Sequence, residues 1–550
     1  MRLLLPMLTL VLFLGLAAIL LCSKPQPRKG SHLHPAEEYL LSLQYPAFGE
    51  GLSIYRSAVW NELRKTRKTR AFGNWQQEGP FNTGGRLNCI AIHPVQANTW
   101  FVGCADGGIF KTTDGANTWQ PVFDMAPSLS VSELVIDSTN PLIMYAGTGD
   151  QVLGGYSHVG SGVFKSTDGG LSWNASGLTN TGAVTRIIID PSNSQILYAG
   201  TMGNPFVSDT NRGVYKSIDG GATWNRILFL GPNAGIGDLL IHPQNSQILY
   251  ATGRRRFRSD LQSVIYGPEA RIYRSINGGV SWDTLSTGLP AGEQCRIGLC
   301  ISKQNPSVLY ANYVDTTLEF SGLYKTTNGG NSWSLINSMS TPNAGGFGWY
   351  FGEIRISPVN DNVLFVLGVG LYKSTNGGNT FVADNGTLHA DKHDLRFVSS
   401  TEILLATDGG FYKSGDGGST WTMKNNLPIT QFYELAYNPF DSLNYYGGAQ
   451  DNGSNFGSLG TGINNWMKYF GGDGFRSQFN PVDDQVFYAE WQNGNVMATS
   501  DAGANFSTLT QSILLNDRCS WNSPYMISHF DPDVLYFGSY RVYKNTTGPV

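Results

Sequence analysis

The 550-residue sequence predicts an all-β protein made of repeated four-stranded blades of a β-propeller. Three observations favour this fold class. Glycine is abundant, at 67 residues, while charged residues make up only 14% of the chain. Long amphipathic patterns of helical period are rare. One ten-residue segment recurs along the chain about every 40 to 58 residues, which is the spacing of one supersecondary unit per repeat.

The recurring segment has the form aromatic, Lys, Ser or Thr, any residue, Asp or Asn, Gly, Gly, any residue, Ser or Thr, Trp. Seven copies end at these aromatic residues: Trp119, Trp173, Trp224, Trp282, Trp333, Phe381 and Trp421. A weaker copy ends at Phe506, and a shortened one at Val550. Asn replaces Asp at Asn277, Asn328 and Asn376. The position therefore requires a hydrogen-bond acceptor rather than a negative charge.

Each repeat contains the parts of four short strands. Alternating apolar stretches around a Pro-x-Asn turn, as in residues 187–200, predict a two-stranded hairpin. The Asp-Gly-Gly turn then joins a third strand to a fourth. We expect its Asp or Asn to accept hydrogen bonds from backbone amides of the turn, and its glycines to supply positive φ angles. The closing aromatic residue is expected to pack between neighbouring sheets.

The repeats divide the chain into four parts. Residues 1–22 have a basic start and an apolar run, typical of a secretory signal peptide, with a lipoprotein signal or an uncleaved anchor as the alternative. Residues 23–81 contain two short helical patterns. Residues 82–428 hold seven blades, and residues 429–550 hold the start of a second, truncated propeller. A single ten-bladed propeller is the alternative arrangement.

Charge and cysteine content exclude several kinds of function. The chain has 37 Lys and Arg against 41 Asp and Glu, so it lacks the basic surface that nucleic-acid binding requires. The six cysteines are scattered and include no Cys-x-x-Cys pair, which argues against a disulfide scaffold and a structural zinc site. We expect no cofactor. The apolar start predicts a secreted or cell-surface protein that contacts a membrane only through its N-terminal segment.

The recurring segment resembles the Asp-box, or BNR, repeat of sialidases, sortilin-type receptors and xyloglucan-active endoglucanases, over residues 82 to 550. The resemblance implies the same propeller fold. A sialidase is disfavoured because the Arg-Ile-Pro element of that group is absent. Two main classes of function stay open: a glycoside hydrolase that takes a polysaccharide or other glycan, and a sortilin-like propeller that binds a peptide or protein ligand without catalysis. A structural surface module is a third.

Two acidic turns outside the boxes are the catalytic candidates. Asp106 lies in GCADGGIFK and Asp451 in GGAQDNGSN, seven units further along. The resemblance to xyloglucan-active enzymes implies that the two carboxylates face each other across a cleft, as acid and base of an inverting cleavage. Asp451 departs from the family pattern because Asn452-Gly453-Ser454 follows it in place of two glycines. Asp408, in TDGGFYKS, resembles Asp106 equally well, and an ordinary turn role is the alternative for all of them.

Residues 389–394 place two histidines and an aspartate at alternate positions. On an extended strand, His389, Asp391 and His393 would share one face. This grouping suits a substrate-facing polar surface, and a divalent metal or structural hydrogen bonding are alternatives. We assign these residues to substrate contact and assign no metal.

Other substrate-contact candidates lie in glycine-flanked segments. Trp349 and Tyr350, in FGWYFGEIR, have rings that would stack on sugar faces, with core packing as the alternative. Asp408 and Asp473 are further candidates for substrate contact. The basic run RRRFR at residues 254–258 is expected to be a solvated loop.

Overall fold

The computed structural model describes residues 77–151, 158–259, 262–338, 342–424, 426–460 and 462–549. The predicted signal segment and the two helical patterns before residue 77 lie outside the described residues. Within these residues the only α-helix is α4 (Gln511–Leu514), and nearly all other regular structure is β-strand. No helix in this part of the chain is long and apolar enough to cross a membrane. The all-β prediction is confirmed.

Antiparallel sheets follow one another along the chain, and the strands in each are paired in chain order. The first four sheets contain β1 (Leu87–Ile92), β2 (Trp100–Cys104), β3 (Ile109–Thr112), β4 (Gln120–Pro121); β5 (Val131–Ile136), β6 (Met144–Thr148), β7 (Val163–Ser166), β8 (Asn174–Ala175); β9 (Ala183–Asp190), β10 (Asn193–Gly203), β11 (Gly213–Ser217), β12 (Asn225–Leu228); and β13 (Ala234–Ile241), β14 (Leu249–Arg255), β17 (Ile272–Ser275), β18 (Asp283–Leu285). A separate hairpin contains β15 (Phe257–Arg258) and β16 (Ser263–Val264).

The next three sheets contain β19 (Arg296–Ile301), β20 (Leu309–Val314), β21 (Phe320–Thr326), β22 (Ser334–Asn337); β23 (Ile354–Ser357), β24 (Asn360–Leu367), β25 (Leu371–Ser374), β26 (Val382–Ala383); and β27 (Lys392–Phe397), β28 (Ile403–Thr407), β29 (Gly410–Ser414), β30 (Thr422–Met423). The last three contain β31 (Phe432–Asn438), β32 (Asp441–Ala449), β33 (Gly453–Ser458), β34 (Met467–Phe470); β35 (Gly474–Phe479), β36 (Phe487–Trp491), β37 (Asn495–Thr499), β38 (Ser507–Thr508); and β39 (Tyr525–Ile527), β40 (Leu535–Gly538), β41 (Val542–Asn545).

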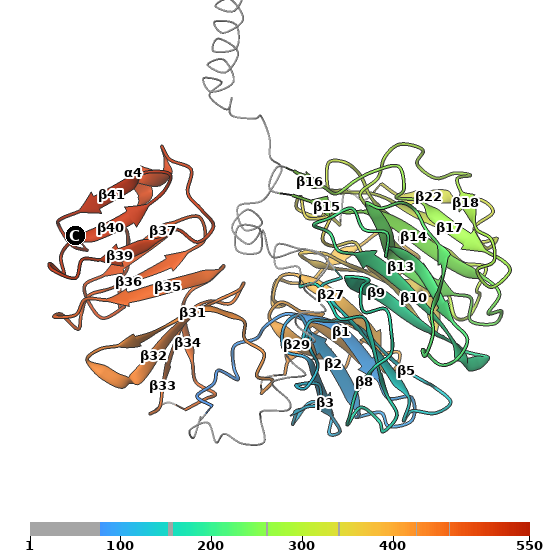
Figure 1. Ribbon diagram of the computed structural model, residues 1–550, viewed down its shortest axis with the longest axis horizontal. Coiled ribbons are helices and arrows are strands. Elements are labelled where there is room, and N and C mark those ends of the chain that lie inside the picture. Colours follow the sequence, from blue (N-terminus) through green and yellow to red (C-terminus); the bar gives the residue numbers. More distant parts are fainter. Residues whose placement is uncertain are drawn as a thin grey trace, which may run out of the picture.

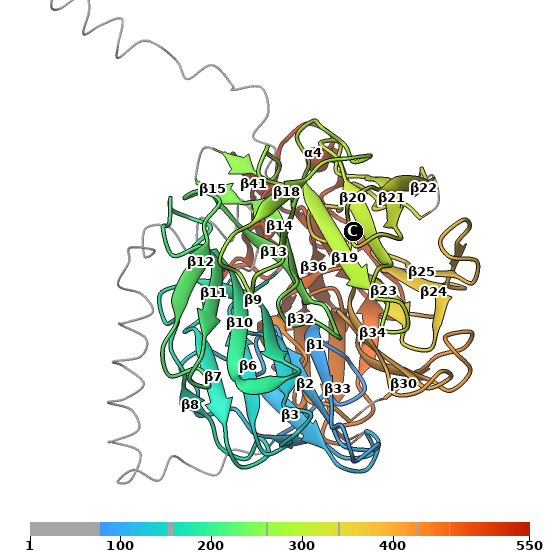
Figure 2. The ribbon, with the colours of Figure 1, turned by 90° about the vertical axis from the view of Figure 1, so that its right-hand side faces the viewer.

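The first seven of these sheets lie around a common axis (Figure 2). The first strand of one sheet contacts that of the next, as β1 does with β5 and β5 with β9. β1 also contacts β27 and β28 of the seventh sheet. The seven sheets therefore close into a ring, with their first strands innermost.

The repeated turn has the hydrogen bonds that its sequence predicts. Asp168 Oδ1 accepts the backbone N–H groups of Leu171 at 3.0 Å and Ser172 at 2.9 Å, and its Oδ2 accepts the Ser172 hydroxyl at 2.6 Å. Asn277 repeats the pattern: its Oδ1 accepts the Ser281 N–H at 2.9 Å and its Nδ2 donates to Ser281 Oγ at 2.8 Å. The prediction that an acceptor suffices at this position is confirmed.

The closing aromatic residue of a box packs against the preceding sheet. The Trp173 ring of the second sheet lies 5.5 Å from Phe123, which follows the first sheet. The Trp119 ring of the first sheet lies 5.4 Å from Phe411 of the seventh. The inter-sheet packing predicted for these residues is confirmed, and the Trp119 contact is made where the ring closes.

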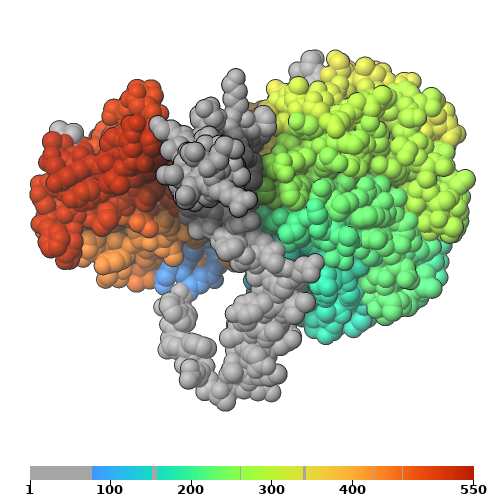
Figure 3. Space-filling view, turned by 45° about the horizontal axis from the view of Figure 1, so that its top comes forward, coloured from blue at the N-terminus to red at the C-terminus, as the bar shows by residue number. Residues whose placement is uncertain are grey.

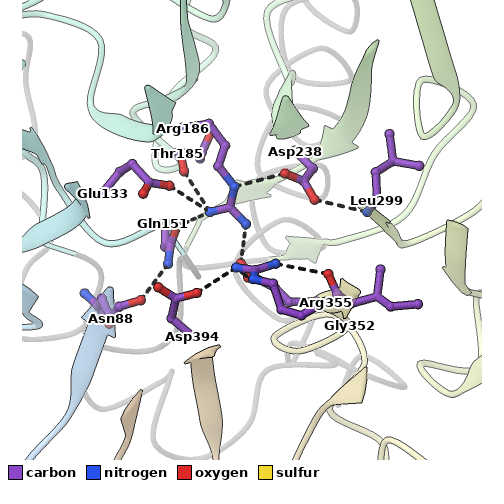
Figure 4. Close-up of polar contacts among 12 residues, drawn as sticks. Asn88, Glu133, Gln151, Thr185, Arg186, Asp238, Leu299, Gly352, Arg355 and Asp394 are labelled. Carbon is purple, nitrogen blue, oxygen red and sulfur yellow. Dashed lines mark hydrogen bonds and ion pairs between the residues drawn. The ribbon is translucent and has the colours of Figure 1, made fainter. Parts of the chain in front are cut away.

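Charged side chains of opposite sign fill the middle of the ring (Figure 4). Arg186 donates to Asp238 at 2.9 Å and also pairs with Glu353. Arg355 pairs with Glu353 and, at 2.8 Å, with Asp394. The remaining members of this channel network are Glu133, Arg296 and Arg396. Since all come from the inner strands or the residues just before them, the network links sheets across the axis.

The last three sheets stack in order beside the ring (Figures 1 and 3). β31 and β32 contact β35. The residues before β1 connect the two parts by hydrogen bonds. Phe81 N–H donates to the Ile463 carbonyl at 2.9 Å, and Asn82 Nδ2 donates to the Trp466 carbonyl at 2.7 Å. These bonds attach the eighth sheet to the ring.

The basic run at residues 254–258 is not a solvated loop. Arg254, Arg256 and Arg258 are buried. Arg254 lies on β14 and donates to the backbone carbonyls of Gln151 at 3.1 Å and Trp349 at 2.6 Å. The expectation was wrong because the alternation of the extended chain turns every second arginine inward, where carbonyl oxygens accept their N–H groups.

Candidate functional site

Three acidic turns with the same position in their sheets lie near where the ring meets the eighth sheet. Asp106 lies between β2 and β3, Asp408 between β28 and β29, and Asp451 between β32 and β33. Each turn joins the second strand of its sheet to the third. The sequence similarity of these turns therefore reflects one structural position, repeated in the first, seventh and eighth sheets.

Asp408 is buried and accepts hydrogen bonds from two sheets. His393 Nε2 lies 2.5 Å from its Oδ1, and Gln450 Nε2 donates to its Oδ2 at 3.0 Å. Asn452 Nδ2 donates to the Asp408 carbonyl at 3.0 Å. Burial by itself would raise the pKa of Asp408, but the adjacent His393 and Arg86 hold that pKa well below its ordinary value. Asp408 is therefore ionised.

Asp451 faces Asp408 across the junction and is partly buried. Gln450 donates to Asp451 Oδ2, and carboxyl oxygens of Asp408 and Asp451 lie within 4.8 Å of each other. The Asp451 backbone N–H donates to Asp473 Oδ1 at 3.1 Å. Burial, followed by the charges of Asp473 and Asp408, raises the pKa of Asp451 well above its ordinary value. Asp451 thus keeps a proton that an exposed aspartate would lose.

Two more carboxyl groups border this pair. Asp391 brings an oxygen within 4.8 Å of oxygens of Asp408 and Asp451, and burial together with the Asp408 charge raises its pKa to about 8. Asp473 accepts the Tyr433 hydroxyl at 3.0 Å, and burial raises its pKa to about 7. Four carboxyl groups therefore share a confined space in which Asp408 carries the charge.

The spacing of Asp391, Asp408 and Asp451 is compatible with a cation. A cation requires unprotonated carboxylates whose lone pairs are free. Here both oxygens of Asp408 accept N–H donors, and Asp451 keeps its proton. We therefore describe these residues as a hydrogen-bonded carboxyl cluster and do not assign them as metal ligands.

Asp106 approaches the same junction from the first sheet. Its Oδ1 lies 3.2 Å from His158 Nε2, its Oδ2 accepts the side-chain amide of Gln431, and its side chain is 32% exposed. The Gln431 carbonyl accepts the Gln450 N–H at 2.9 Å. Gln431 and Gln450 therefore connect Asp106 to the turn that carries Asp451.

The contacts of Asp106 and Asp451 differ from those of the box aspartates. Asp114 and Asp168 accept backbone N–H groups of their own turns. Among the described residues, the partners found for the Asp106 and Asp451 carboxyl groups are side chains instead. This difference separates the two candidate residues from aspartates that only stabilise a turn.

His389, Asp391 and His393 do not share one strand face. β27 begins only at Lys392, and Asp391 has a φ of 65°, in the left-handed region. The expectation was wrong because the chain turns at Asp391 instead of running extended. All three residues still border the acidic turns: His389 Nε2 lies 3.1 Å from the Asp451 carbonyl oxygen, while His393 binds Asp408.

Trp349 and Tyr350 both contact arginine side chains. Tyr350 is buried, its hydroxyl accepts an Arg86 N–H, and its ring lies 5.7 Å from that of His393. It is therefore not the exposed sugar platform expected from the sequence, because its ring packs among the residues that support Asp408. Trp349 is partly buried, with the Arg256 guanidinium 5.0 Å from its ring.

Sequence reasoning missed Arg86, Gln431 and Gln450. Arg86 and Gln431 each stand directly before the first strand of a sheet, as does Asp473 before β35. This shared position is the signal that would have found them, but it is visible only when strand starts are known. Gln450 directly precedes Asp451 in the GGAQDNGSN turn, so the choice of Asp451 as a candidate could have drawn attention to Gln450.

Known proteins similar to this chain include xyloglucanases. A xyloglucanase of Acetivibrio thermocellus is 24% identical over 360 residues, covering 51% of this chain and 39% of the relative. A xyloglucanase of a Paenibacillus species is 24% identical over 259 residues, covering 42% of this chain and 24% of the relative. The chain thus spans well under half of the length of these relatives. No model of a known protein family matches it.

A solved structure shares the fold. The crystal structure of a GH74 enzyme from Niastella koreensis superposes with a TM-score of 0.59 at 17% identity, covering 86% of this chain and 73% of that one. Together with the succession of four-stranded antiparallel sheets, this likeness confirms the propeller-like architecture predicted from the repeats.

Proposed function

We propose that this protein is a glycoside hydrolase that cleaves a β-glucan related to xyloglucan. The similarity to xyloglucanases supports the substrate class. The observation that carries the proposal is the pair of aspartates at the junction. Asp451 keeps a proton beside ionised Asp408, while the partly exposed Asp106 accepts hydrogen bonds from Gln431 and lies beside His158. An inverting glycoside hydrolysis needs one carboxyl group that donates a proton and one that accepts a proton from water.

In this proposal Asp451 is the general acid and Asp106 the general base of an inverting cleavage. Asp451 gives its proton to the glycosidic oxygen while the bond from that oxygen to the anomeric carbon breaks. Asp106 takes a proton from the water that attacks the anomeric carbon from the opposite side. The products are a sugar with inverted anomeric configuration and a shortened glucan.

The proposal is tested by measuring reducing ends released from xyloglucan and other β-glucans. We expect Asp106→Asn and Asp451→Asn each to lower kcat by about 100-fold or more, the usual contribution of an acid or base. Asp168→Asn is the matched control, because Asn fills that box position in three other blades with the same hydrogen bonds. The proposal is wrong if both variants keep the wild-type rate. Glucan binding without product release would favour the non-catalytic alternative.

We also propose that the protein is exported, since residues 1–22 read as a signal segment and polysaccharide substrates lie outside the cell. N-terminal sequencing of the mature protein should find it beginning near residue 23. A mature chain that still begins at Met1 and carries no lipid at Cys22 would exclude a cleaved signal peptide and a lipoprotein signal. The uncleaved membrane anchor would then be the remaining interpretation of residues 1–22.

A further inference from the structure

Asp408 and His393 form a pair without an assigned role in the proposed reaction. Both were expected to contact substrate, but they are only 1% and 4% exposed. A glucan chain therefore reaches neither side chain in this structure. Any part they take in the reaction must pass through a residue that the substrate does reach, and the partly buried Asp451 is linked to Asp408 by the Gln450 amide, which donates to both.

The hydrogen bonds of the pair lead from the seventh sheet to Asp451, the proposed general acid. A carboxylate only accepts hydrogen bonds, so His393 Nε2 donates to Asp408 Oδ1 at 2.5 Å. The Gln450 amide donates to both Asp408 Oδ2, at 3.0 Å, and Asp451 Oδ2. Gln450 therefore fixes the two carboxyl groups relative to each other. Because carboxyl oxygens of the two residues lie within 4.8 Å of each other, two negative charges there would repel, and one proton, on Asp451, relieves that repulsion.

The charges around the cluster favour this distribution of the proton. Asp391, just before β27, brings an oxygen within 4.8 Å of oxygens of Asp408 and Asp451, and Asp473, just before β35, accepts the Asp451 backbone N–H. The Arg86 charge lowers the pKa of Asp408, and the charges of Lys392 and Arg86 lower that of Asp391. His389 contacts Asp451 only through a backbone carbonyl. Asp408 is thus the better site for the charge, and Asp451 for the proton.

We propose that Asp408 and His393 are positioning residues that hold the proton on Asp451 and aim its carboxyl group into the junction. The inference rests on the proposed function, in which Asp451 is the general acid. Asp408 contributes a fixed negative charge next to Asp451, and His393 keeps that charge in place. No covalent step involves the pair.

The pH profile of glucan hydrolysis tests the role of Asp408. The alkaline limb of kcat reports loss of the proton from the acid. Asp408→Asn keeps the shape and an acceptor for His393 but removes the negative charge, so Asp451 should lose its proton more readily. We expect the alkaline limb to move to lower pH by about one unit or more. Asp168→Asn should leave it unmoved. An unshifted limb in a folded, active Asp408→Asn variant would overturn the proposal.

Variants of His393 provide a second test should Asp408→Asn fail to fold. Without its histidine donor, Asp408 competes with Asp451 for the shared proton, so His393→Ala should lower the plateau of kcat without moving the alkaline limb to lower pH. His393→Gln keeps an N–H group for Asp408 and should restore most of the lost rate. If His393→Ala keeps the full plateau rate, or if Gln restores no more than Ala, the pair has only a structural role.

An infrared titration separates this inference from the proposed function, because it needs no substrate. The difference spectrum between the wild-type protein and Asp451→Asn isolates the protonated carboxyl band of Asp451. In the Asp408→Asn background that band should disappear at lower pH than in the wild type. A band that titrates identically in both backgrounds contradicts the inference whether or not glucans are cleaved. A shifted band in a protein that cleaves no glucan would refute the proposed function alone.

Discussion

The box aspartates and three aspartates of the junction, Asp391, Asp451 and Asp473, have opposite affinity for a proton. In the boxes, hydrogen bonds from the side chain and backbone of Thr118 lower the pKa of Asp114 to about 2, and Ser172 does the same for Asp168. At the junction, burial raises the pKa of Asp391 to about 8 and of Asp473 to about 7. The side chain is the same, and the surrounding donors and burial decide whether it suits turn stabilisation or acid chemistry.

At the residue scale, the box aspartates predict a loss of stability in acid. Their folded pKa values of about 2 lie below the ordinary value of 3.8, so ionisation stabilises the folded state. The contribution is complete above about pH 4 and is lost as the pH falls toward 2. We expect Tm to fall over this interval, and to fall less steeply in Asp168→Asn. Thermal melts at intervals between pH 5 and 2 measure both slopes, and equal slopes would contradict this explanation.

The repeated turn is the element that makes each blade similar, and its two glycines have different constraints. Both have positive φ, 71° at Gly169 and 82° at Gly170. A Cβ at Gly169 would come no closer than 3.6 Å to Leu142, whereas a Cβ at Gly170 would lie 2.7 Å from the Phe101 ring of the neighbouring sheet. The first glycine serves the turn, and the second also serves the packing between sheets.

At the element scale, alanine substitutions should separate these two roles. Gly169→Ala introduces only the left-handed backbone penalty, about 1 kcal/mol of unfolding free energy. Gly170→Ala adds the steric conflict with Phe101, so we expect about 2 to 4 kcal/mol in total. Urea unfolding of the two variants measures the difference. Equal losses of unfolding free energy would show that Phe101 and its sheet can shift to accept the added methyl group without loss of stability.

The closed ring of sheets depends on contacts between residues far apart in the sequence. Trp119 packs on Phe411 across the closure, and the channel network joins Arg186 to Glu133, Asp238 and Glu353 from three other sheets. Removing one member leaves its partners buried without a counter-charge, which costs far more than breaking an exposed ion pair.

At the scale of the whole molecule, Arg186→Met should lower the unfolding free energy by about 3 to 5 kcal/mol, because three buried carboxylates lose a partner. The control is Lys413→Met, which breaks the partly exposed 2.7 Å pair with Glu402 at the seventh sheet and should cost about 1 kcal/mol or less. Both are measured by urea unfolding followed through tryptophan fluorescence. A loss for Arg186→Met no larger than that of the control would mean that the channel network adds little to stability.

The repeat, the turn chemistry and the all-β architecture could be predicted from the sequence by itself. The reason is that the decisive interactions are local: Asp168 binds residues three and four positions along, and the glycines set their own φ. The three acidic turns could also be found, since Asp106, Asp408 and Asp451 repeat one pattern.

Only the tertiary structure decided which of these turns meet and what state their carboxyl groups take. His393 and Asp408 come from the seventh sheet and Gln450 and Asp451 from the eighth, and their contact follows from how the eighth sheet attaches to the ring. Sequence patterns wrongly predicted that His389, Asp391 and His393 share one strand face. They also wrongly predicted that residues 254–258 form a solvated loop. Burial, which raises the pKa of Asp451 and hides Tyr350, is a property of packed sheets, so no single repeat contains it.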